Sequence, residues 1–170
     1  ISEIFGGKFV KAENILIEEF LNGEEMSFFT IHDGKNFKNF GTAQDHKRVL
    51  EGDQGKNTGG MGAYSPTPLV TKNLLATIIK EIIKPTIDEL RKKNIDYRGV
   101  IYFGLMITKS GPKVIEYNCR FGDPECQTIM PLLDKNFVVL LQKCATGSLK
   151  GDEEIKMTNK VSGCVIATSK

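Results

Sequence analysis

The sequence is short of the residues on which several kinds of site depend. Histidine occurs only as His32 and His46, which excludes a histidine-rich metal site. The four cysteines, at 119, 126, 144 and 164, lack the short paired spacing that marks a zinc site, and no segment resembles a secretion signal. We therefore expect reduced thiols and a cytoplasmic protein.

Long hydrophobic runs and an excess of one charge are also missing. No apolar run approaches the ~20 residues that a helix needs to cross a bilayer. The 23 basic residues nearly balance 21 acidic ones, giving a formal net charge of +2, and they are not gathered in a stripe. We expect neither a membrane nor a nucleic acid as partner, although a local basic cluster suffices to hold a phosphate.

The hydrophobic residues that are present predict an antiparallel sheet. They make up 40% of 170 residues, which is enough for one compact domain or a large piece of a bigger one. Residues 15–21 predict a buried strand, and 26–40 predict a hairpin around Asp33 and Gly34, which tolerate positive φ. A second hairpin is predicted for 100–108 and 112–118, joined by residues 109–111.

Helical spacing and capping residues predict helices beside this sheet. Thr71 caps an apolar-faced helix that continues to Leu90, and Pro85 inside it predicts a kink near Lys84. A short helix is predicted to begin at Pro124 or Glu125, and another spans 137–146, ended by Gly147. The expected fold is therefore α/β (α+β), an antiparallel sheet with flanking helices.

Residues 41–68 carry six glycines and two prolines with little periodic hydrophobicity. Loops longer than about 12 to 15 residues are usually functional or disordered, so we predict a functional loop here. In residues 57–62, glycine allows backbone N–H groups to converge on an anion, and Thr58 adds a donor. Residues 45–48 add positive charge. The segment is read either as a site for a phosphorylated substrate or as an ordinary glycine-rich loop.

The run VIEYNCRFGDPE, residues 114–125, carries the clearest chemical pattern. In a strand, Glu116 and Asn118 share a face. A carboxylate beside an amide oxygen suits Mg²⁺, which fills its other positions with phosphate oxygens and water. Arg120 follows on that face, and its guanidinium suits a phosphate or a carboxylate. The pattern predicts a phosphoryl-transfer site, with a solvated edge strand as the alternative.

A third candidate is EEFLNGEE, residues 18–25. A strand that leaves the core here offers backbone N–H and C=O groups to an adenine edge. A carboxylate a few residues later accepts hydrogen bonds from ribose hydroxyls. The alternative is a strand followed by a charged bend.

Two segments together resemble the signature regions of the phosphoribosylamine–glycine ligases, or glycinamide ribonucleotide synthetases. They are AQDHKRVLEGDQGKNTGGMGAYSP (43–66) and KVIEYNCRFGDPECQ (113–127). Such ligases are ATP-grasp enzymes of purine biosynthesis, and the resemblance runs in order from Ile15 to Leu149. It implies an ATP-grasp fold, of which this chain carries the carboxy-terminal half of the ATP-binding domain. It also implies ligation of glycine to 5-phosphoribosylamine through glycyl phosphate, giving glycinamide ribonucleotide, ADP and phosphate.

The resemblance also assigns roles to individual residues. Residues expected at the ATP adenine and ribose are Glu18, Phe20, Leu21, Glu25, Met106 and Ile115. Glu116 and Asn118 are expected to hold Mg²⁺ (or Mn²⁺), and Arg120, with Asp123 nearby, to act in catalysis. Residues expected near glycine and 5-phosphoribosylamine are Asp45, Lys47, Asn57, Thr58, Gly59 and Gly60.

The resemblance sets expected boundaries. Residues 1–149 belong to the ATP-grasp domain without its amino-terminal portion, 150–160 form a linker, and 161–170 begin the carboxy-terminal domain. Both ends look cut, and we expect the final strand to lack neighbours and the 170 residues alone to be inactive. The strand at 100–108 lacks the acidic metal ligand that many ATP-grasp enzymes carry there.

Three questions stay open at this stage. The substrate pair is either that of the glycine enzyme or that of another ATP-grasp carboxylate–amine ligase with a phosphoribosyl substrate. A noncatalytic nucleotide-binding module is the alternative from another class. The chain is also compatible with fusion to other purine-pathway domains.

Overall fold

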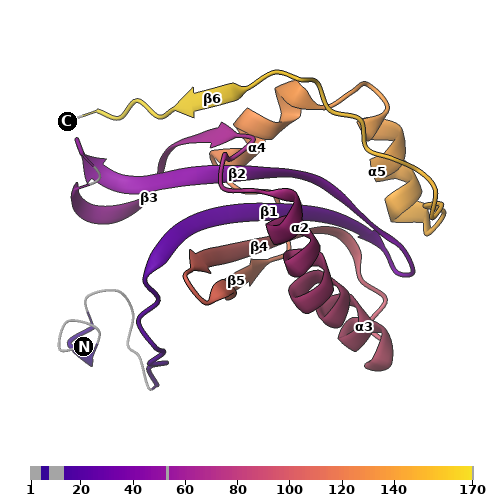
Figure 1. Ribbon diagram of the computed structural model, residues 1–170, viewed down its shortest axis with the longest axis horizontal. Coiled ribbons are helices and arrows are strands. Elements are labelled where there is room, and N and C mark those ends of the chain that lie inside the picture. The colour runs from indigo at the N-terminus through magenta and orange to yellow at the C-terminus, as the bar shows by residue number, and fades with distance from the viewer. Residues whose placement is uncertain (1–4, 8–13, 53, 170) are drawn as a thin grey trace.

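A six-stranded antiparallel sheet organises the computed structural model, which describes residues 5–7, 14–52 and 54–169 (Figure 1). The strand order is β5–β4–β1–β2–β3–β6. The strands are β1 (Gly23–Asp33), β2 (Phe37–Leu50), β3 (Gln54–Ser65), β4 (Arg98–Thr108), β5 (Gly111–Asn118) and β6 (Ser162–Val165).

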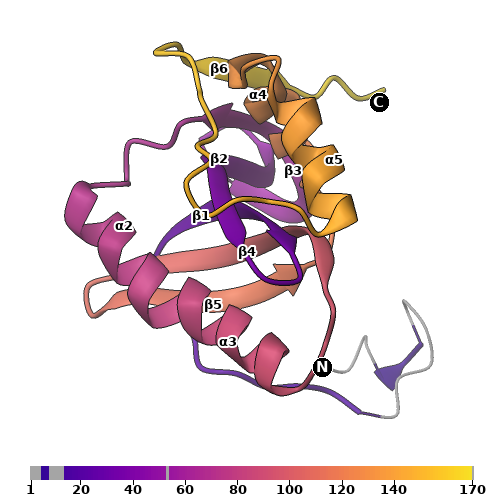
Figure 2. The same cartoon turned by 90° about the vertical axis from the view of Figure 1, so that its right-hand side faces the viewer.

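Helices cover both faces of this sheet, as Figures 1 and 2 show from two sides. One face carries α2 (Lys72–Ile78), the π-helical turn η1 (Ile79–Ile83) and α3 (Lys84–Lys92). The other carries α4 (Glu125–Ile129), the 3-10 turn η2 (Met130–Leu132) and α5 (Phe137–Thr146). None of the described helices is long and apolar enough to cross a membrane.

The central strand β1 contributes to two hydrophobic cores because its alternate side chains point to opposite faces. Phe29 and Ile31 pack in the core beneath α5, together with Tyr102. Met26 and Phe28 pack against the isoleucine-rich helix on the other side. Burying such side chains contributes about 1.5–3 kcal/mol each, so the middle of β1 is a major source of stability.

The predicted hairpin between β1 and β2 is confirmed, and Asp33 holds its turn together. Gly34 has a φ of +92°. Oδ1 of Asp33 accepts hydrogen bonds from the backbone N–H groups of Lys35 at 2.8 Å and Asn36 at 2.5 Å. Oδ2 accepts one from the N–H of Leu149 at 2.9 Å. The same buried carboxylate therefore ties the turn to the segment that follows α5.

The predicted strand at residues 15–21 is wrong, because β1 begins only at Gly23. Leu16, Ile17 and Phe20 are 82%, 77% and 93% exposed. An apolar run becomes a strand when a neighbouring strand takes up its backbone hydrogen bonds, and none of the described strands pairs with this segment.

The predicted long loop at 41–68 is also wrong, because most of it is strand. β2 and β3 pair through Gln44 opposite Tyr64 and Arg48 opposite Asn57. Toward their shared turn, both strands are exposed on both faces. They therefore lack the alternation of apolar and polar residues by which a strand is recognised in a sequence.

The other predicted elements are confirmed with small adjustments. The side chain of Thr71 accepts a hydrogen bond from the N–H of Leu74 at 3.1 Å. Before Pro85, which has no N–H to donate, the helix changes to π-type hydrogen bonding over Ile79–Ile83. The kink near Lys84 stays a prediction. The second hairpin, α4 and α5 lie where predicted, and Gly147 ends α5 with a φ of +70°.

The final strand does have a neighbour, contrary to expectation. β6 pairs with β3 over Gly62–Ser65, with Gly62 opposite Val165 and Ser65 opposite Ser162. It lies at the edge of the sheet beside α4 (Figure 1). Residues Ser162–Val165 thus extend the same sheet.

Asp33→Asn tests whether the buried carboxylate holds the hairpin. Burial raises the pKa of Asp33, but the N–H groups of Asn36, Lys35 and Leu149 together outweigh it and hold the pKa below its ordinary value. Its stabilising contribution is therefore present above the ordinary carboxyl pKa and lost as the pH falls through the folded-state pKa. We expect the substitution to lower the unfolding free energy by about 1–3 kcal/mol at neutral pH and by less in acid.

Chemical denaturation at several pH values measures this effect. Asp152→Asn, at an exposed aspartate, serves as the matched control and should leave the unfolding free energy within about 0.5 kcal/mol. Equal effects of the two substitutions would contradict the role given to Asp33.

Candidate functional site

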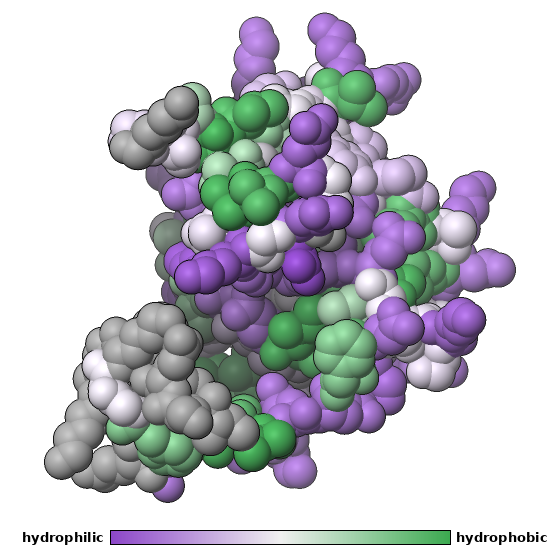
Figure 3. Space-filling view, turned by 90° about the vertical axis from the view of Figure 1, so that its left-hand side faces the viewer, coloured by the Kyte–Doolittle hydropathy of each residue, from purple (hydrophilic) through white to green (hydrophobic). Residues whose placement is uncertain are grey.

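Polar side chains gather on the α5 face of the sheet, beyond the end of the core. Ser27 on β1 lies opposite Ala43 on β2 and Gly104 on β4, and Gly104 lies opposite Glu116 on β5. Glu25, two residues before Ser27 on the same face of β1, lies opposite Met106 on β4. Figure 3 shows the left-hand side of Figure 1, where hydrophilic and hydrophobic side chains both border a hollow. β1 and β5 thus bring Ser27, Glu25 and Glu116 to one surface, where the intervening β4 contributes Gly104 and Met106.

The ion pair of Lys47 with Glu25 joins β2 to β1 in this surface. Burial lowers the pKa of Lys47, but Glu25, with Asp45 and Glu116 nearby, outweighs it and raises the pKa above its ordinary value. Lys47 therefore stays charged among several carboxylates. The predicted substrate residues Asp45 and Lys47 do lie together, beside the predicted ribose residue Glu25.

Asp45 is electrostatically unusual. Burial, and then the nearby charge of Glu125, raise the pKa of Asp45 from 3.8 to about 7. Its Oδ1 oxygen is buried and has no hydrogen-bond partner among the described residues. A group with this pKa changes its charge near neutral pH, which is common at functional sites.

Glu125 is a member of the site that sequence reasoning missed. It is only 3% exposed, and its Oε1 accepts a hydrogen bond from Oγ of Ser27 at 2.9 Å. Oγ of Ser27 also lies 3.1 Å from the hydroxyl of Tyr102. In the sequence, Glu125 stands at the start of a predicted helix, where acidic residues are common, so nothing marked it out.

Glu116 and Asn118 share a face of β5, as the strand period predicts. Glu116 lies over Gly104, where an added Cβ would be 2.9 Å from its Cγ. A register shift follows between Gly104 and Leu105, so Ile115 has no partner in the ladder. Nδ2 of Asn118 is buried without a hydrogen-bond partner in the described part of the chain. The amide of Asn118 is thus not committed to a donor role within the protein.

Arg120 and Asp123 lie in the turn after β5 and are exposed. The guanidinium of Arg120 donates to the carbonyl oxygen of its neighbour Phe121 at 2.8 Å. Asp123 accepts a hydrogen bond from Nε2 of Gln127 at 2.7 Å. Both partners are local, so the structure does not bring these two predicted catalytic residues into contact with Glu116 or Asn118.

The glycine-rich segment of β3 contacts the turn that precedes α4. A Cβ added at Gly60 would lie 2.1 Å from Cδ of Pro124, 2.8 Å from the carbonyl oxygen of Asp123 and 3.0 Å from Oδ1 of Asp45. Only glycine permits so close an approach. Gly60 therefore brings the two signature segments of the sequence into one site.

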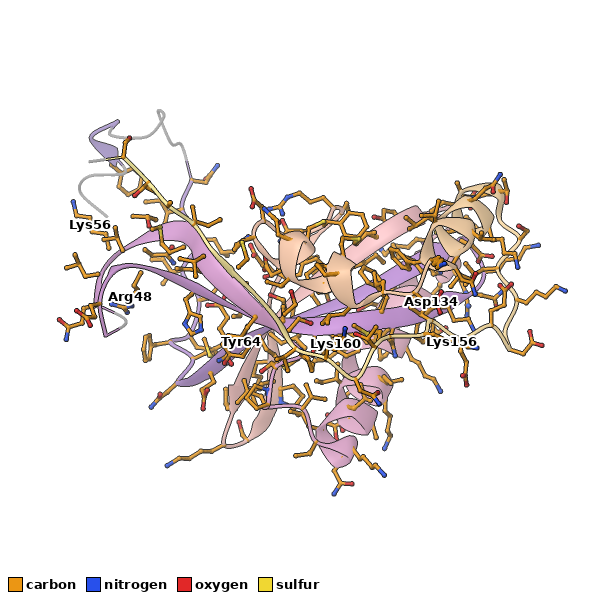
Figure 4. The ribbon with its side chains drawn as sticks, turned by 90° about the horizontal axis from the view of Figure 1, so that it is seen from above. Arg48, Lys56, Tyr64, Asp134, Lys156 and Lys160 are labelled. Carbon is orange, nitrogen blue, oxygen red and sulfur yellow. The ribbon has the colours of Figure 1, made fainter. Side chains whose placement is uncertain are left out.

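The neighbouring residues 57–59 are more open. Gly59 has a φ of +90° and no atom within 4 Å of an added Cβ, and its N–H donates to Oδ1 of Asn57 at 3.2 Å. The hydroxyl of Thr58 donates to the carbonyl oxygen of Lys47 at 3.4 Å. Figure 4 shows Arg48 and Lys56 at the curved outer end of the β2–β3 ribbon, away from Asp134 near α5.

Two adjoining cavities contain most of the predicted site residues. The residues that line the first include all those predicted for the nucleotide: Glu18, Phe20, Leu21, Glu25, Met106 and Ile115. The second is lined by Asp45, Lys47 and Asn57, and it shares Phe20, Leu21, Glu25 and Met106 with the first. The two cavities thus share four residues, and charged side chains line both.

This fold and site define an ATP-grasp domain. A crystal structure of biotin carboxylase from Campylobacter jejuni has the same fold, with a TM-score of 0.61 and 19% identity over 86% of this chain and 30% of that chain. A crystal structure of phosphoribosylamine–glycine ligase from Thermotoga maritima is far more similar, with a TM-score of 0.81 and 32% identity over 96% of this chain and 41% of that chain.

The chain belongs to the family of the phosphoribosylglycinamide synthetase ATP-grasp (A) domain, whose pattern matches residues 1–126. It is 47% identical to the phosphoribosylamine–glycine ligase of Caulobacter vibrioides, over 98% of this chain and 39% of that protein. It is 46% identical to the trifunctional purine biosynthetic protein adenosine-3 of Bos taurus, over 100% of this chain and 17% of that protein. The chain thus spans well under half the length of these relatives.

Asp45→Asn tests the electrostatics of the site. Because the folded-state pKa is raised, the folded protein binds this proton more tightly than the unfolded chain, and ionising Asp45 costs stability as the pH rises from 3.8 to about 7. We expect the gain in unfolding free energy caused by the substitution to be ~1–3 kcal/mol larger at about pH 8 than at about pH 4. Chemical denaturation of both proteins at the two pH values measures it; parallel pH profiles would contradict the raised pKa.

Gly60→Ala tests the contact between the two signature segments. The added methyl group overlaps Pro124 and the backbone of Asp123, so we expect a loss of about 1–3 kcal/mol in unfolding free energy. Gly151→Ala is the matched control, since no atom lies within 4 Å of its added Cβ. If thermal unfolding shows the same midpoint for both variants, the close contact does not exist in solution.

Proposed function

We propose that this chain is the metal- and nucleotide-binding half of a phosphoribosylamine–glycine ligase, which joins glycine to 5-phosphoribosylamine with the hydrolysis of ATP to ADP and phosphate. The observation that carries the proposal is the contact of Gly60 with Pro124. It joins the two signature segments beside a cavity that contains every residue expected at the nucleotide. The identity to ligases of the same name supports it.

The proposed reaction overcomes the low reactivity of a carboxylate toward amines. Transfer of the γ-phosphoryl group of ATP to the glycine carboxylate gives glycyl phosphate and ADP. The amine of 5-phosphoribosylamine then attacks the acyl carbon, phosphate leaves, and the nitrogen loses a proton to give glycinamide ribonucleotide. The protein contributes chiefly by positioning the reactants and stabilising the transferred charge.

Glu116 and Asn118 would hold a divalent metal ion, Mg²⁺ or Mn²⁺. Among the described residues no three acidic, histidine or cysteine side chains gather as metal ligands. The fit therefore rests on one carboxylate and one amide oxygen that share a face of β5, which suits an ion that keeps phosphate and water in its remaining positions. When bound, such an ion neutralises charge on the ATP phosphates. Arg120 would add a cation for the transferred group once it leaves its local hydrogen bond.

The remaining residues would position the substrates. Phe20, Leu21, Met106 and Ile115 would enclose the adenine, and Glu25 would accept hydrogen bonds from the ribose. Residues proposed to contact glycine and 5-phosphoribosylamine are Asp45, Lys47, Asn57, Thr58, Gly59 and Gly60, with Asp123 nearby. All four cysteines are free, in keeping with a proposed cytoplasmic location. The relatives include single-function ligases and trifunctional proteins, and the same site would serve either.

Glu116→Gln in the full-length protein tests the proposed function. We expect phosphate release from ATP only when glycine and freshly generated 5-phosphoribosylamine are both present. The substitution removes the charge that holds the metal ion, so kcat should fall about 100- to 1000-fold. Glu154→Gln, at an exposed glutamate outside the site, should keep its full activity.

Other outcomes would identify a different protein. Phosphate release with another acid or amine would assign the chain to a related carboxylate–amine ligase. ATP binding without release for any substrate pair would favour a noncatalytic nucleotide-binding module. Full activity of Glu116→Gln would contradict the metal role alone.

A further inference from the structure

The part of β5 that carries Glu116 and Asn118 has little support from the sheet itself. β5 is an edge strand, so among the described strands only β4 pairs with it. The ladder with β4 shifts register just before Glu116, which leaves Ile115 without a partner, and the chain bends directly after Asn118. Residues 116–118 therefore lie between an irregularity and a bend. Side chains on so short a piece of strand keep a fixed orientation only if further contacts hold it.

Tyr117 makes such a contact on the opposite face of β5. Because side chains alternate along a strand, Tyr117 points away from the face that Glu116 and Asn118 share. Its ring lies edge-on to that of Phe103, its partner on β4, with ring centroids 5.4 Å apart and an interplanar angle of 68°. Phe103 is fully buried in the core against the isoleucine-rich helix. The ring of Tyr117 is thus anchored to the core.

The hydroxyl of Tyr117 joins β5 to α3. It lies 3.2 Å from Oγ1 of Thr86, which is 31 residues earlier in the sequence. Oγ1 of Thr86 donates its single proton to the carbonyl oxygen of Ile82 at 2.7 Å. In the hydrogen bond between the two hydroxyls, Tyr117 is therefore the donor and Thr86 the acceptor.

The π-helical turn η1 sets the position of Thr86. The N–H of Lys84 donates to the carbonyl oxygen of Ile79, as π-type hydrogen bonding requires. Ile82, which accepts the proton of Thr86, belongs to the same turn and is buried in the core. Turns of this type are rare and are frequent at functional sites. Thr86 thus offers Tyr117 an acceptor whose place is fixed by the core.

We propose that Tyr117 is a positioning residue for the metal site, an inference that rests on the proposed function. Its hydroxyl, held by Thr86, fixes the backbone of residues 116–118. The backbone in turn fixes the carboxylate of Glu116 and the amide of Asn118 on the other face. Without this hydrogen bond the two groups lose part of their fixed spacing, and a divalent ion binds more weakly.

Binding of Mn²⁺ to the full-length protein with a nonhydrolysable ATP analogue tests this inference in Tyr117→Phe. Phenylalanine keeps the ring contact with Phe103 and removes only the hydroxyl. We expect the dissociation constant of Mn²⁺, measured from free Mn²⁺ by electron paramagnetic resonance, to rise about 2- to 10-fold, the factor that one hydrogen bond supplies. The dissociation constant of the analogue without a divalent ion should stay unchanged, which a partly unfolded variant could not achieve.

Substitutions of Thr86 test the other side of the same hydrogen bond. Thr86→Val should weaken Mn²⁺ binding by the same factor as Tyr117→Phe. The double variant should bind no more weakly than either single variant, because one hydrogen bond can be lost only once. Thr86→Ser keeps the hydroxyl and should bind Mn²⁺ as the unaltered protein does.

Thr77→Val is the matched control. Oγ1 of Thr77, in α2, donates to the carbonyl oxygen of Asn73 at 3.1 Å, which is the same kind of hydrogen bond that Thr86 makes within its helix. The acceptor of Tyr117 is Thr86, so Thr77→Val should leave Mn²⁺ binding unchanged.

Three results would overturn the positioning role alone. The first is unchanged Mn²⁺ binding in Tyr117→Phe while Glu116→Gln loses it. The second is an equal weakening of analogue binding with and without Mn²⁺, which would reveal a general structural effect. The third is a weakening in Tyr117→Phe that Thr86→Val does not reproduce.

A different result would overturn the proposed metal site, and the inference with it. The unaltered protein would then show no binding of Mn²⁺ with the analogue, or Glu116→Gln would retain that binding in full. Either outcome would be seen before Tyr117 is changed, so the two failures are distinguishable.

Discussion

The central strand β1 is hydrogen-bonded on both sides and covered on both faces, and the rest of the structure is positioned relative to it. Its middle residues anchor the two hydrophobic cores. Toward its amino-terminal end, the same α5 face carries Ser27 and Glu25 in place of core residues. The registers with β2 and β4 then place Asp45, Lys47 and, through β5, Glu116 on that surface. A rigid hydrophobic strand thus sets the geometry of a charged site.

The site contains features that cost stability, and this is characteristic of binding sites. Glu125 is buried without a cation, and Asp45 and Asn118 each have a buried polar atom without a partner among the described residues. Interior polar groups are nearly always hydrogen-bonded, so a ligand that supplies partners for Asp45 and Asn118 would recover some of this stability. Stability lost here is offset by the two cores, which lie on either side of β1.

Sequence patterns succeeded where an element makes its own hydrophobic face or cap, and failed where it does not. The helix that begins after Thr71, the Asp33 hairpin and α5 follow from spacing and local hydrogen bonds. The β2–β3 ribbon was predicted to be a loop because, beyond the core, its side chains are exposed on both faces. Residues 15–21 were predicted to be a strand because of their composition, but a strand also needs a partner.

The sequence by itself determined which chemical groups are available. The alternation in β5 placed Glu116 and Asn118 on one face, and the two signature segments indicated the family. The tertiary structure alone decided how distant groups meet. Ser27 and Glu125 are 98 residues apart, and Gly60 meets Pro124 only because two strands and a turn converge. Burial and electrostatic coupling depend on such contacts, so the burial of Glu125 and the raised pKa of Asp45 had no local signal in the sequence.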